Sequence, residues 1–360
     1  MPLQTTVIGS YPKPESVPVP DWFKAGPGIR TGQEGYSAQE YNDFRKDVAS
    51  EEELEKQITR AIREVIQEQT DIGIDVITDG ELRRENYILY FCRQLNGFDF
   101  DNLVKETFRN GAWSGFVPAV VSEVGPRDDR PFVLEEWQAA QSLTDQPVKI
   151  TIPGPMTIIG STANRFYKDR KELSEALVSV INREVRALAD AGCKYIQIDE
   201  PVMMRNPDIA EDYGIEHVTR CFKGLPMDIT KSVHACCGYP SYLDQTDYLK
   251  ADRTLYDRLA TKLDNAGFDQ ISIEDAHCPT DLSFLSKFSR TTVVLGVVAI
   301  ARSRVEPVEE IRGRVREALR FLPPHRLVLA PDCGLGFLPR DVLRTKLKNM
   351  VAAAKTFPVN

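Results

Sequence analysis

Basic runs and long apolar stretches are both absent from this chain of 360 residues. No segment approaches the roughly 20 apolar residues that a membrane-spanning helix needs. The net charge of −8 argues against nucleic acid and anionic membranes as partners. The opening MPLQTTVIGS also lacks the charged start and apolar stretch of a secretion signal. We therefore expect a protein that is soluble and cytoplasmic.

Cysteine is sparse, with seven residues scattered along the chain. A disulfide framework is typical of short secreted chains with an even cysteine count, so reduced thiols fit this sequence better. Repeats, low-complexity segments and obvious linkers are missing too. The length is sufficient for one large core. We expect a single catalytic domain over residues 1–360.

Eight short β-branched runs recur along the chain, each closed by Gly, Pro, Asp or Cys. They cover residues 5–10, 75–81, 148–155, 195–201, 231–237, 270–276, 292–300 and 326–334. Most are continuously apolar, as parallel strands covered on both faces are. Amphipathic stretches with helix start and stop signals lie between them, for example at 50–73 and 171–192.

This alternation predicts the α/β class and a (β/α)₈ TIM barrel, whose active site lies at the carboxyl ends of the strands. A doubly wound open sheet is the alternative. Residues 11–50 and 84–145 are too long for simple connections. We interpret them as an N-terminal insertion and an insertion between the second and third strands, both at the barrel mouth.

Polar residues cluster at the carboxyl ends of these runs, where a barrel interior would otherwise be apolar. They are Ser10, Asp79, Glu81, Asp199, Glu200, His234, Cys236, Glu274, Asp275, Asp332 and Cys333. Capping of the following helices accounts for Asp275 and Asp332. Capping does not require a histidine or cysteines, so the remaining residues need another explanation.

His234, Cys236, Glu274 and Cys333 form a candidate zinc site. His234 and Cys236 are two positions apart on one strand, so both side chains share a face. Imidazole, two thiolates and a carboxylate suit tetrahedral zinc, and in a closed or strongly curved sheet their strand ends converge. The alternative is that the cysteines are ordinary core residues and His234 hydrogen-bonds locally.

The charge of this ligand set indicates its chemistry. Two thiolates and a carboxylate weaken the Lewis acidity of zinc, so the site is poorly suited to making hydroxide. It suits a substrate thiol held as a nucleophilic thiolate, with Glu274 as the most easily displaced ligand. We expect alkyl transfer to a thiol.

The motifs themselves resemble the cobalamin-independent methionine synthase family. They are TTVIGSYPKP, DVITDGELRR, QSLTDQPVKITIPGPMTI, YIQIDEP, HACC, ISIED and LAPDCGLG. The resemblance covers nearly the whole chain and is to the C-terminal catalytic barrel, as in short "core" members. It implies a barrel like that of uroporphyrinogen decarboxylase, zinc on the four residues named above, and methyl transfer to homocysteine to form methionine.

The resemblance also implies an acceptor site. Homocysteine would lie over Ile8, Gly9 and Ser10, with its ammonium held by Glu81 and Asp199. Two carboxylates suit a cationic amine and would repel a sulfonate or carboxylate at the same place.

Several positions depart from the family pattern, all where the resemblance implies contacts to methyltetrahydrofolate. Ser161 stands at a stacking Trp position, SGF at 114–116 replaces a Ser-Arg-Cys contact, and Arg205 replaces a Glu. Ala299 and Ala301 replace the Asp and His of a DIHSP segment whose His is proposed to protonate the leaving group. We expect a different donor, such as methylcobalamin or a corrinoid protein carrying it.

Other interpretations remain open. A zinc-dependent transferase such as an epoxyalkane:coenzyme M transferase would need an acid for the alkoxide, and His277 is a candidate for that role. A loop hydrogen bond is an equally good explanation of His277. Arg83 and Arg84 could accommodate a sulfonate, although they suit ion pairs with nearby acids better. A decarboxylase and a non-catalytic zinc-binding protein are further alternatives, and a homo-oligomer is possible.

Overall fold

The computed structural model describes residues 2–21, 23, 36–43, 48–108, 113–246, 251–252 and 254–359. Its strands are β1 (Gln4–Thr5), β2 (Leu95–Phe108), β3 (Trp113–Pro126), β4 (Ile150–Pro153), β5 (Ala163–Asn164), β6 (Tyr195–Asp199), β7 (Thr230–Ala235), β8 (Gln270–Ile273), β9 (Thr292–Val298) and β10 (Leu327–Pro331). Its α-helices are α1 (Ala38–Asp43), α2 (Glu51–Ile72), α3 (Tyr87–Arg93), α4 (Phe132–Gln141), α5 (Pro155–Ile159), α6 (Arg170–Asp190), α7 (Pro207–Ile209), α8 (Ile215–Cys221), α9 (Thr254–Asn265), α10 (Val308–Ala318) and α11 (Arg340–Ala354). Short 3₁₀ segments and one π-helical turn, at Ala210–Gly214, complete the fold.

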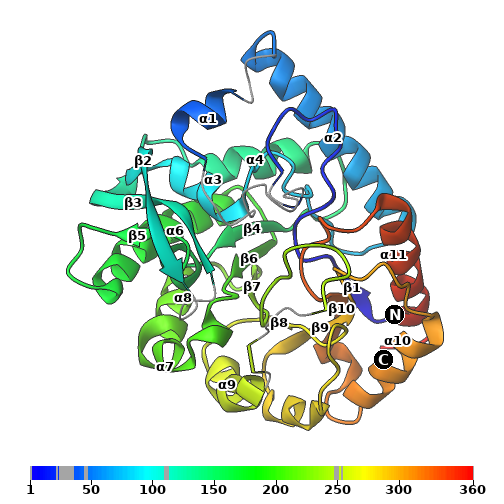
Figure 1. The fold of residues 1–360 in the computed structure, drawn as a ribbon. Coiled ribbons are helices and arrows are strands. Elements are labelled where there is room, and N and C mark those ends of the chain that lie inside the picture. The colour runs from blue at the N-terminus through cyan, green and yellow to red at the C-terminus, as the bar shows by residue number, and fades with distance from the viewer. Residues whose placement is uncertain are drawn as a thin grey trace.

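A strongly curved parallel sheet lies at the centre of the molecule, with helices around its outside (Figure 1). Its seven strands follow the order β1-β10-β9-β8-β7-β6-β4. Every neighbouring pair is parallel. The α/β class and seven of the eight predicted strands are therefore confirmed.

The predicted strand at 75–81 takes a different form. Val76 and Ile77 make isolated parallel bridges to Thr6 and Val148, so this segment links the two edges of the sheet. The pairing is short because the chain turns away directly afterwards, through Gly80 and Glu81 with φ of 74° and 58°.

The helices that cover the sheet begin and end where the sequence signals them. In α2, the Ser50 hydroxyl accepts the N–H of Glu53, and Gly73 closes the helix with φ of 90°. In α6, the Asp169 carboxylate caps the first turn. Buried apolar side chains on the inner faces of these helices pack against the strands and form one continuous core. Among the described residues, no helix is both long and apolar enough to cross a membrane.

The insertion at 84–145 builds a structure of its own. It contains α3, the long antiparallel hairpin β2–β3, and α4. The hairpin lies beside β5 and α6, outside the parallel sheet (Figure 1). From this insertion, α3 and the end of β2 reach the mouth of the central cavity. Much of the other predicted insertion, 11–50, lies outside the described residues; the described part includes α1.

Candidate active site

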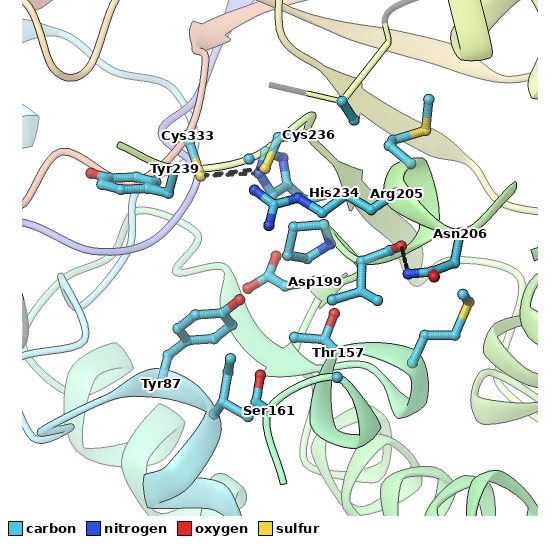
Figure 2. A pocket seen from close by; sticks show the side chains of 18 of the residues that line it. Tyr87, Thr157, Ser161, Asp199, Arg205, Asn206, His234, Cys236, Tyr239 and Cys333 are labelled. Carbon is cyan, nitrogen blue, oxygen red and sulfur yellow. Dashed lines mark hydrogen bonds between the residues drawn. The ribbon is translucent and has the colours of Figure 1, made fainter. Parts of the chain in front are cut away.

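His234, Cys236 and Cys333 converge at the carboxyl ends of β7 and β10. The Nε2 atom of His234 lies 3.2 Å from Cys333 Sγ, and the two sulfurs are 3.9 Å apart (Figure 2). All three ligand atoms lie within 4.8 Å of one another. One imidazole nitrogen and two thiol sulfurs at this spacing fit the donor set of a zinc site.

A neighbouring strand fixes the orientation of the histidine. The Nδ1 atom of His234 is 2.9 Å from the hydroxyl of Ser272 on β8. This contact leaves Nε2 directed toward the sulfurs, as the outer contacts of metal-binding histidines do.

Glu274, the fourth predicted ligand, is buried one residue beyond β8. Its Oε2 accepts the N–H of Cys237 at 3.3 Å, so the carboxylate lies next to the residue that follows Cys236. Within the described part of the chain, the close metal-binding group consists of the other three residues. The close group thus contains three of the four predicted ligands, and the role of Glu274 stays a prediction.

The electrostatics of the group favour a thiolate at Cys236. A hydrogen bond from the Cys333 thiol lowers the pKa of Cys236 well below its ordinary value, with His234 adding to this effect against burial. Burial acts to lower the pKa of His234, but the neighbouring Cys236 outweighs it and the net shift is upward. Cys236 is therefore the thiol that deprotonates first, and a thiolate is the form that binds metal.

Glu81 lines the same cavity and has an unusual backbone conformation. Its φ of 58° is uncommon for a residue other than glycine, and its N–H donates to Asp79 Oδ1 at 2.9 Å. The Thr151 hydroxyl donates to Oε1 at 2.6 Å, and Arg84 lies 3.8 Å from the same oxygen. Burial raises the pKa of this carboxyl to about 7 despite Arg84.

Asp199 ends β6 and lies beside His234 in the sheet register. The Gln197 amide donates to its Oδ1 at 2.7 Å. Burial raises the pKa of Asp199 to about 6, while the charge of His234 acts to lower it. Lys149 is buried below both acids and donates to the Val7 carbonyl at 2.6 Å; burial lowers its pKa to about 7. Two buried carboxylates therefore face a shared space in which a positive charge would be stabilised.

Two glycines make this space possible. A Cβ on Gly9 would overlap the Glu81 carboxylate, and a Cβ on Gly334 would overlap the Ser10 hydroxyl. The backbone also joins these segments, because Leu335 N–H donates to the Ser10 carbonyl at 2.8 Å. Ser10, which follows β1, is thus held against the two residues after Cys333.

The cavity that contains these groups has a volume of about 820 Å³. It brings together Ile8, Gly9, Ser10, Glu81 and Asp199, all predicted substrate residues, with His234, Cys236 and Cys333.

Sequence reasoning missed several lining residues, among them Tyr87, Thr157 and Tyr239. Tyr87 of α3 points its hydroxyl toward Asp199 (Figure 2). One signal for α3 was present: the Asn86 side chain accepts the N–H groups of Ile88 and Leu89 as a helix cap, and Asn before an apolar run is a start signature.

Two expectations about acids at the strand ends need correction. Asp332 does not cap a helix, because α11 begins only at Arg340. Its carboxylate instead accepts the N–H groups of Asp275, Ala276 and His277, which follow β8, at 2.7–2.9 Å. Asp275 pairs with Arg314 and accepts the Thr280 N–H. Both acids brace loops rather than helix ends.

His277 is held by backbone groups. Its Nε2 accepts the N–H groups of Ile300 and Ala301 at 3.1 and 3.2 Å, so this nitrogen carries no proton to donate. Among the described residues, those that line the cavity do not include His277.

Arg83 and Arg84, considered as partners for a sulfonate, are engaged elsewhere. Arg83 makes two hydrogen bonds of 2.5 Å to Glu55. Arg84 bonds to Thr151 at 2.9 Å and to Glu136 at 3.2 Å. Both guanidinium groups therefore serve the fold around Glu81.

Comparison with known proteins identifies the family of the chain. Residues 32–220 and 248–356 match the family described as cobalamin-independent synthase, catalytic domain. The chain belongs to this family. Methionine synthases of Sulfolobus acidocaldarius and Sulfurisphaera tokodaii are 30% and 32% identical to it, over 97% and 98% of this chain and 90% and 92% of theirs. The structure of a B12-independent methionine synthase from Shewanella sp. W3-18-1, in complex with selenomethionine, superposes with a TM-score of 0.83 at 28% identity, covering 99% of this chain and 98% of that one.

The positions that the sequence predicts to depart from the family pattern fall into three groups in the structure. Ser161 and Arg205 line the cavity. Ala299 and Ala301 are buried instead, and the Ala299 carbonyl accepts a hydrogen bond from Lys346. Phe116 is exposed on the β2–β3 hairpin. The residues of the first group can therefore contact a ligand in the cavity.

Proposed function

We propose that this chain transfers a methyl group to the thiol of homocysteine and forms methionine. The observation that carries the proposal is one cavity with two opposite features: two buried carboxylates for an ammonium group, and a histidine–dithiol group for a thiol. The relatives named methionine synthase support it. We further infer that residues 76–77 complete the curved sheet as the eighth strand of a (β/α)₈ barrel, and that residues 1–360 act as one domain.

His234, Cys236 and Cys333 would hold zinc, with Glu274 as a fourth and exchangeable ligand. When bound, zinc would lower the pKa of a coordinated substrate thiol and so supply the nucleophile. The position of Glu274 supports this role. Its carboxylate accepts the N–H of Cys237, the residue after Cys236, and lies outside the close group. A substrate sulfur could then take its place while the other three ligands remain.

The residues of the chain orient the acceptor. Glu81 and Asp199 would bind its ammonium, and Ile8, Gly9 and Ser10 would form the floor beneath it. In the transfer, the new carbon–sulfur bond forms as the bond between the methyl carbon and the donor breaks. The electron pair of that bond leaves with the donor, and the thiol proton is released. The buried surroundings exclude water and fix the in-line geometry.

We propose that the donor is not methyltetrahydrofolate. Ser161 provides no aromatic platform in the cavity, and Ala301 provides no acid. Methylcobalamin, free or on a corrinoid protein, needs no acid because Co(I) leaves without a proton. His277 has no part in this reaction, since its Nε2 already accepts two N–H groups.

The test is to incubate the zinc-loaded protein with homocysteine and each donor separately, and to measure methionine by mass spectrometry. We expect methionine from methylcobalamin, and at most about one hundredth of that rate from methyltetrahydrofolate. Efficient turnover with methyltetrahydrofolate would refute the donor assignment. Full activity after removal of zinc by a chelator would refute the metal. Transfer from a small epoxide to coenzyme M, without methionine formation, would favour the alkyltransferase alternative.

A further inference from the structure

Arg205 carries a guanidinium group inside the cavity that has no ion-pair partner among the described residues. The residue ends the short 3₁₀ segment Met203–Arg205, which follows β6, and is half-buried. Figure 2 shows its side chain extending into the cavity toward the His234–Cys236–Cys333 group. In the part of the chain that the structure describes, no hydrogen bond or ion pair joins this guanidinium to another side chain.

The other arginines near the cavity differ from Arg205. Arg84, directly behind Glu81, is buried and satisfied by Glu136 and Thr151. Arg170 lines the outer cavity at the start of α6, where it is exposed to solvent. A half-buried cation without an anionic partner loses hydration and gains little in return. Such a group is best explained by a ligand that supplies the missing negative charge.

The position of Arg205 in the cavity indicates which substrate would supply this negative charge. The proposed acceptor residues lie in the segment after β1, at the end of β6 and on the turn at Glu81, where the protein is acidic and would repel an anion. Arg205 belongs to the wall formed by the loops after β4 and β6, together with Ser161 and Val202. A cavity of about 820 Å³ is far larger than one small amino acid requires, so this wall faces the space left for the second substrate.

We propose that Arg205 binds an oxyanion group, a carboxylate or a phosphate, of the methyl donor. The planar guanidinium fork is suited to two parallel hydrogen bonds with either group. This inference rests on the proposed function, because it assigns one substrate of that reaction. It places the donor's charged group at the wall formed by the loops after β4 and β6.

The experiment uses the zinc-loaded protein saturated with homocysteine, so that the acceptor site is filled. Inorganic phosphate, the probe oxyanion, is titrated into it by calorimetry at constant ionic strength. We expect Arg205→Met to weaken phosphate binding at least about tenfold, as the loss of a charge-assisted hydrogen-bond pair does. Arg205→Lys should retain part of the affinity. Arg170→Met is the matched control, and it should change the affinity by less than about threefold.

Three results would overturn the proposal: no phosphate binding by the unsubstituted protein, equal binding by Arg205→Met, or phosphate binding that occurs only in the absence of homocysteine. The last would mean that Arg205 holds the α-carboxylate of the acceptor instead. Unchanged zinc content and circular dichroism show that each variant is folded. Phosphate binding requires no turnover, so absent methionine formation with intact phosphate binding counts against the proposed function alone.

Discussion

The two walls of the cavity are built in contrasting ways. On the acceptor wall, Glu81, Asp199 and His234 are buried, and each makes a hydrogen bond to a side chain on a strand of the parallel sheet. On the opposite wall, Ser161 and Arg205 are half-buried, and the Arg205 guanidinium has no partner among the described side chains. We infer that the acceptor wall is organised before a ligand arrives, and that the opposite wall would be completed by its ligand. Changes to the first should therefore damage zinc and homocysteine binding, and changes to the second should spare both.

The largest effect should come from Cys333→Ser. Serine is a poor zinc ligand, so we expect zinc content to fall from one equivalent toward zero and methyl transfer to fall at least about a hundredfold. Metal analysis and methionine formation measure the two effects. Cys278→Ser is the control, because Cys278 is half-buried and outside the metal-binding group. A Cys333→Ser protein that keeps both zinc and activity would remove the site assignment.

Glu81→Gln should be the next most harmful change. The variant keeps the shape of the side chain but not its charge, so kcat/KM for homocysteine should fall about 10–100-fold with zinc content unchanged.

The pH profile of the unsubstituted protein tests the same residue. Burial raises the pKa of Glu81 to about 7 and that of Asp199 to about 6, so the charged forms needed to bind an ammonium are lost as pH falls. We expect kcat/KM for homocysteine to rise from pH 5.5 to pH 8. In Glu81→Gln the part of the rise near pH 7 should disappear. An unchanged profile in the variant would exclude Glu81 as the ammonium partner.

Ser272→Ala tests whether a residue outside the metal-binding group orients His234. The Ser272 hydroxyl contacts His234 Nδ1, so its loss should free the imidazole to rotate. We expect zinc affinity to fall about tenfold, the lower end of the effect of such outer contacts. Competition with a chelator of known affinity measures it. Equal zinc affinity in Ser272→Ala and the unsubstituted protein would show that the sheet alone orients His234.

Gly9→Ala should have the smallest effect of the four. Its new Cβ would meet the Glu81 carboxylate, so Glu81 must shift and the KM for homocysteine should rise about tenfold, with zinc retained. Gly313→Ala is the matched control, because a Cβ there meets nothing within 4 Å. Gly313 lies inside α10, so this control should raise the free energy of unfolding by about 0.5–1 kcal/mol without changing KM. A KM for Gly9→Ala that equals that of the control would show that Glu81 tolerates displacement.

The parallel strands could be predicted because burial on both faces leaves a clear apolar pattern in the sequence. The β2–β3 hairpin could not. Its strands contain Gly97, Gly115 and Pro118 as well as several charged residues, and one face is partly exposed. The sequence of the hairpin therefore shows neither a continuous apolar run nor a regular alternation of apolar and polar residues. The segment at 75–81 has the pattern of a strand, but its pairing is limited to Val76 and Ile77 by the turn that presents Glu81.

Some polar residues of the site could likewise be predicted from the sequence, and others could not. His234, Cys236 and Cys333 could be predicted because residue type and strand position are sufficient to bring them together. The position of the Glu274 carboxylate depends on a rotamer and on the Cys237 N–H, which no sequence pattern records. The surroundings of His277 and Asp332 are set by contacts between loops that are distant in sequence, and the sequence alone gives no signal for them.

The ligands of the metal-binding group come from widely separated parts of the chain, and this has a consequence for folding. His234 and Cys333 are 99 positions apart, and β8 and β9 lie between their strands in the sheet. Closing a loop of this length has a large entropic cost, so the group can form only after four neighbouring strands are in register. Zinc uptake should thus be a late event that reports completion of the C-terminal half of the sheet. The binding energy of zinc would then stabilise the folded state without guiding the earlier steps of folding.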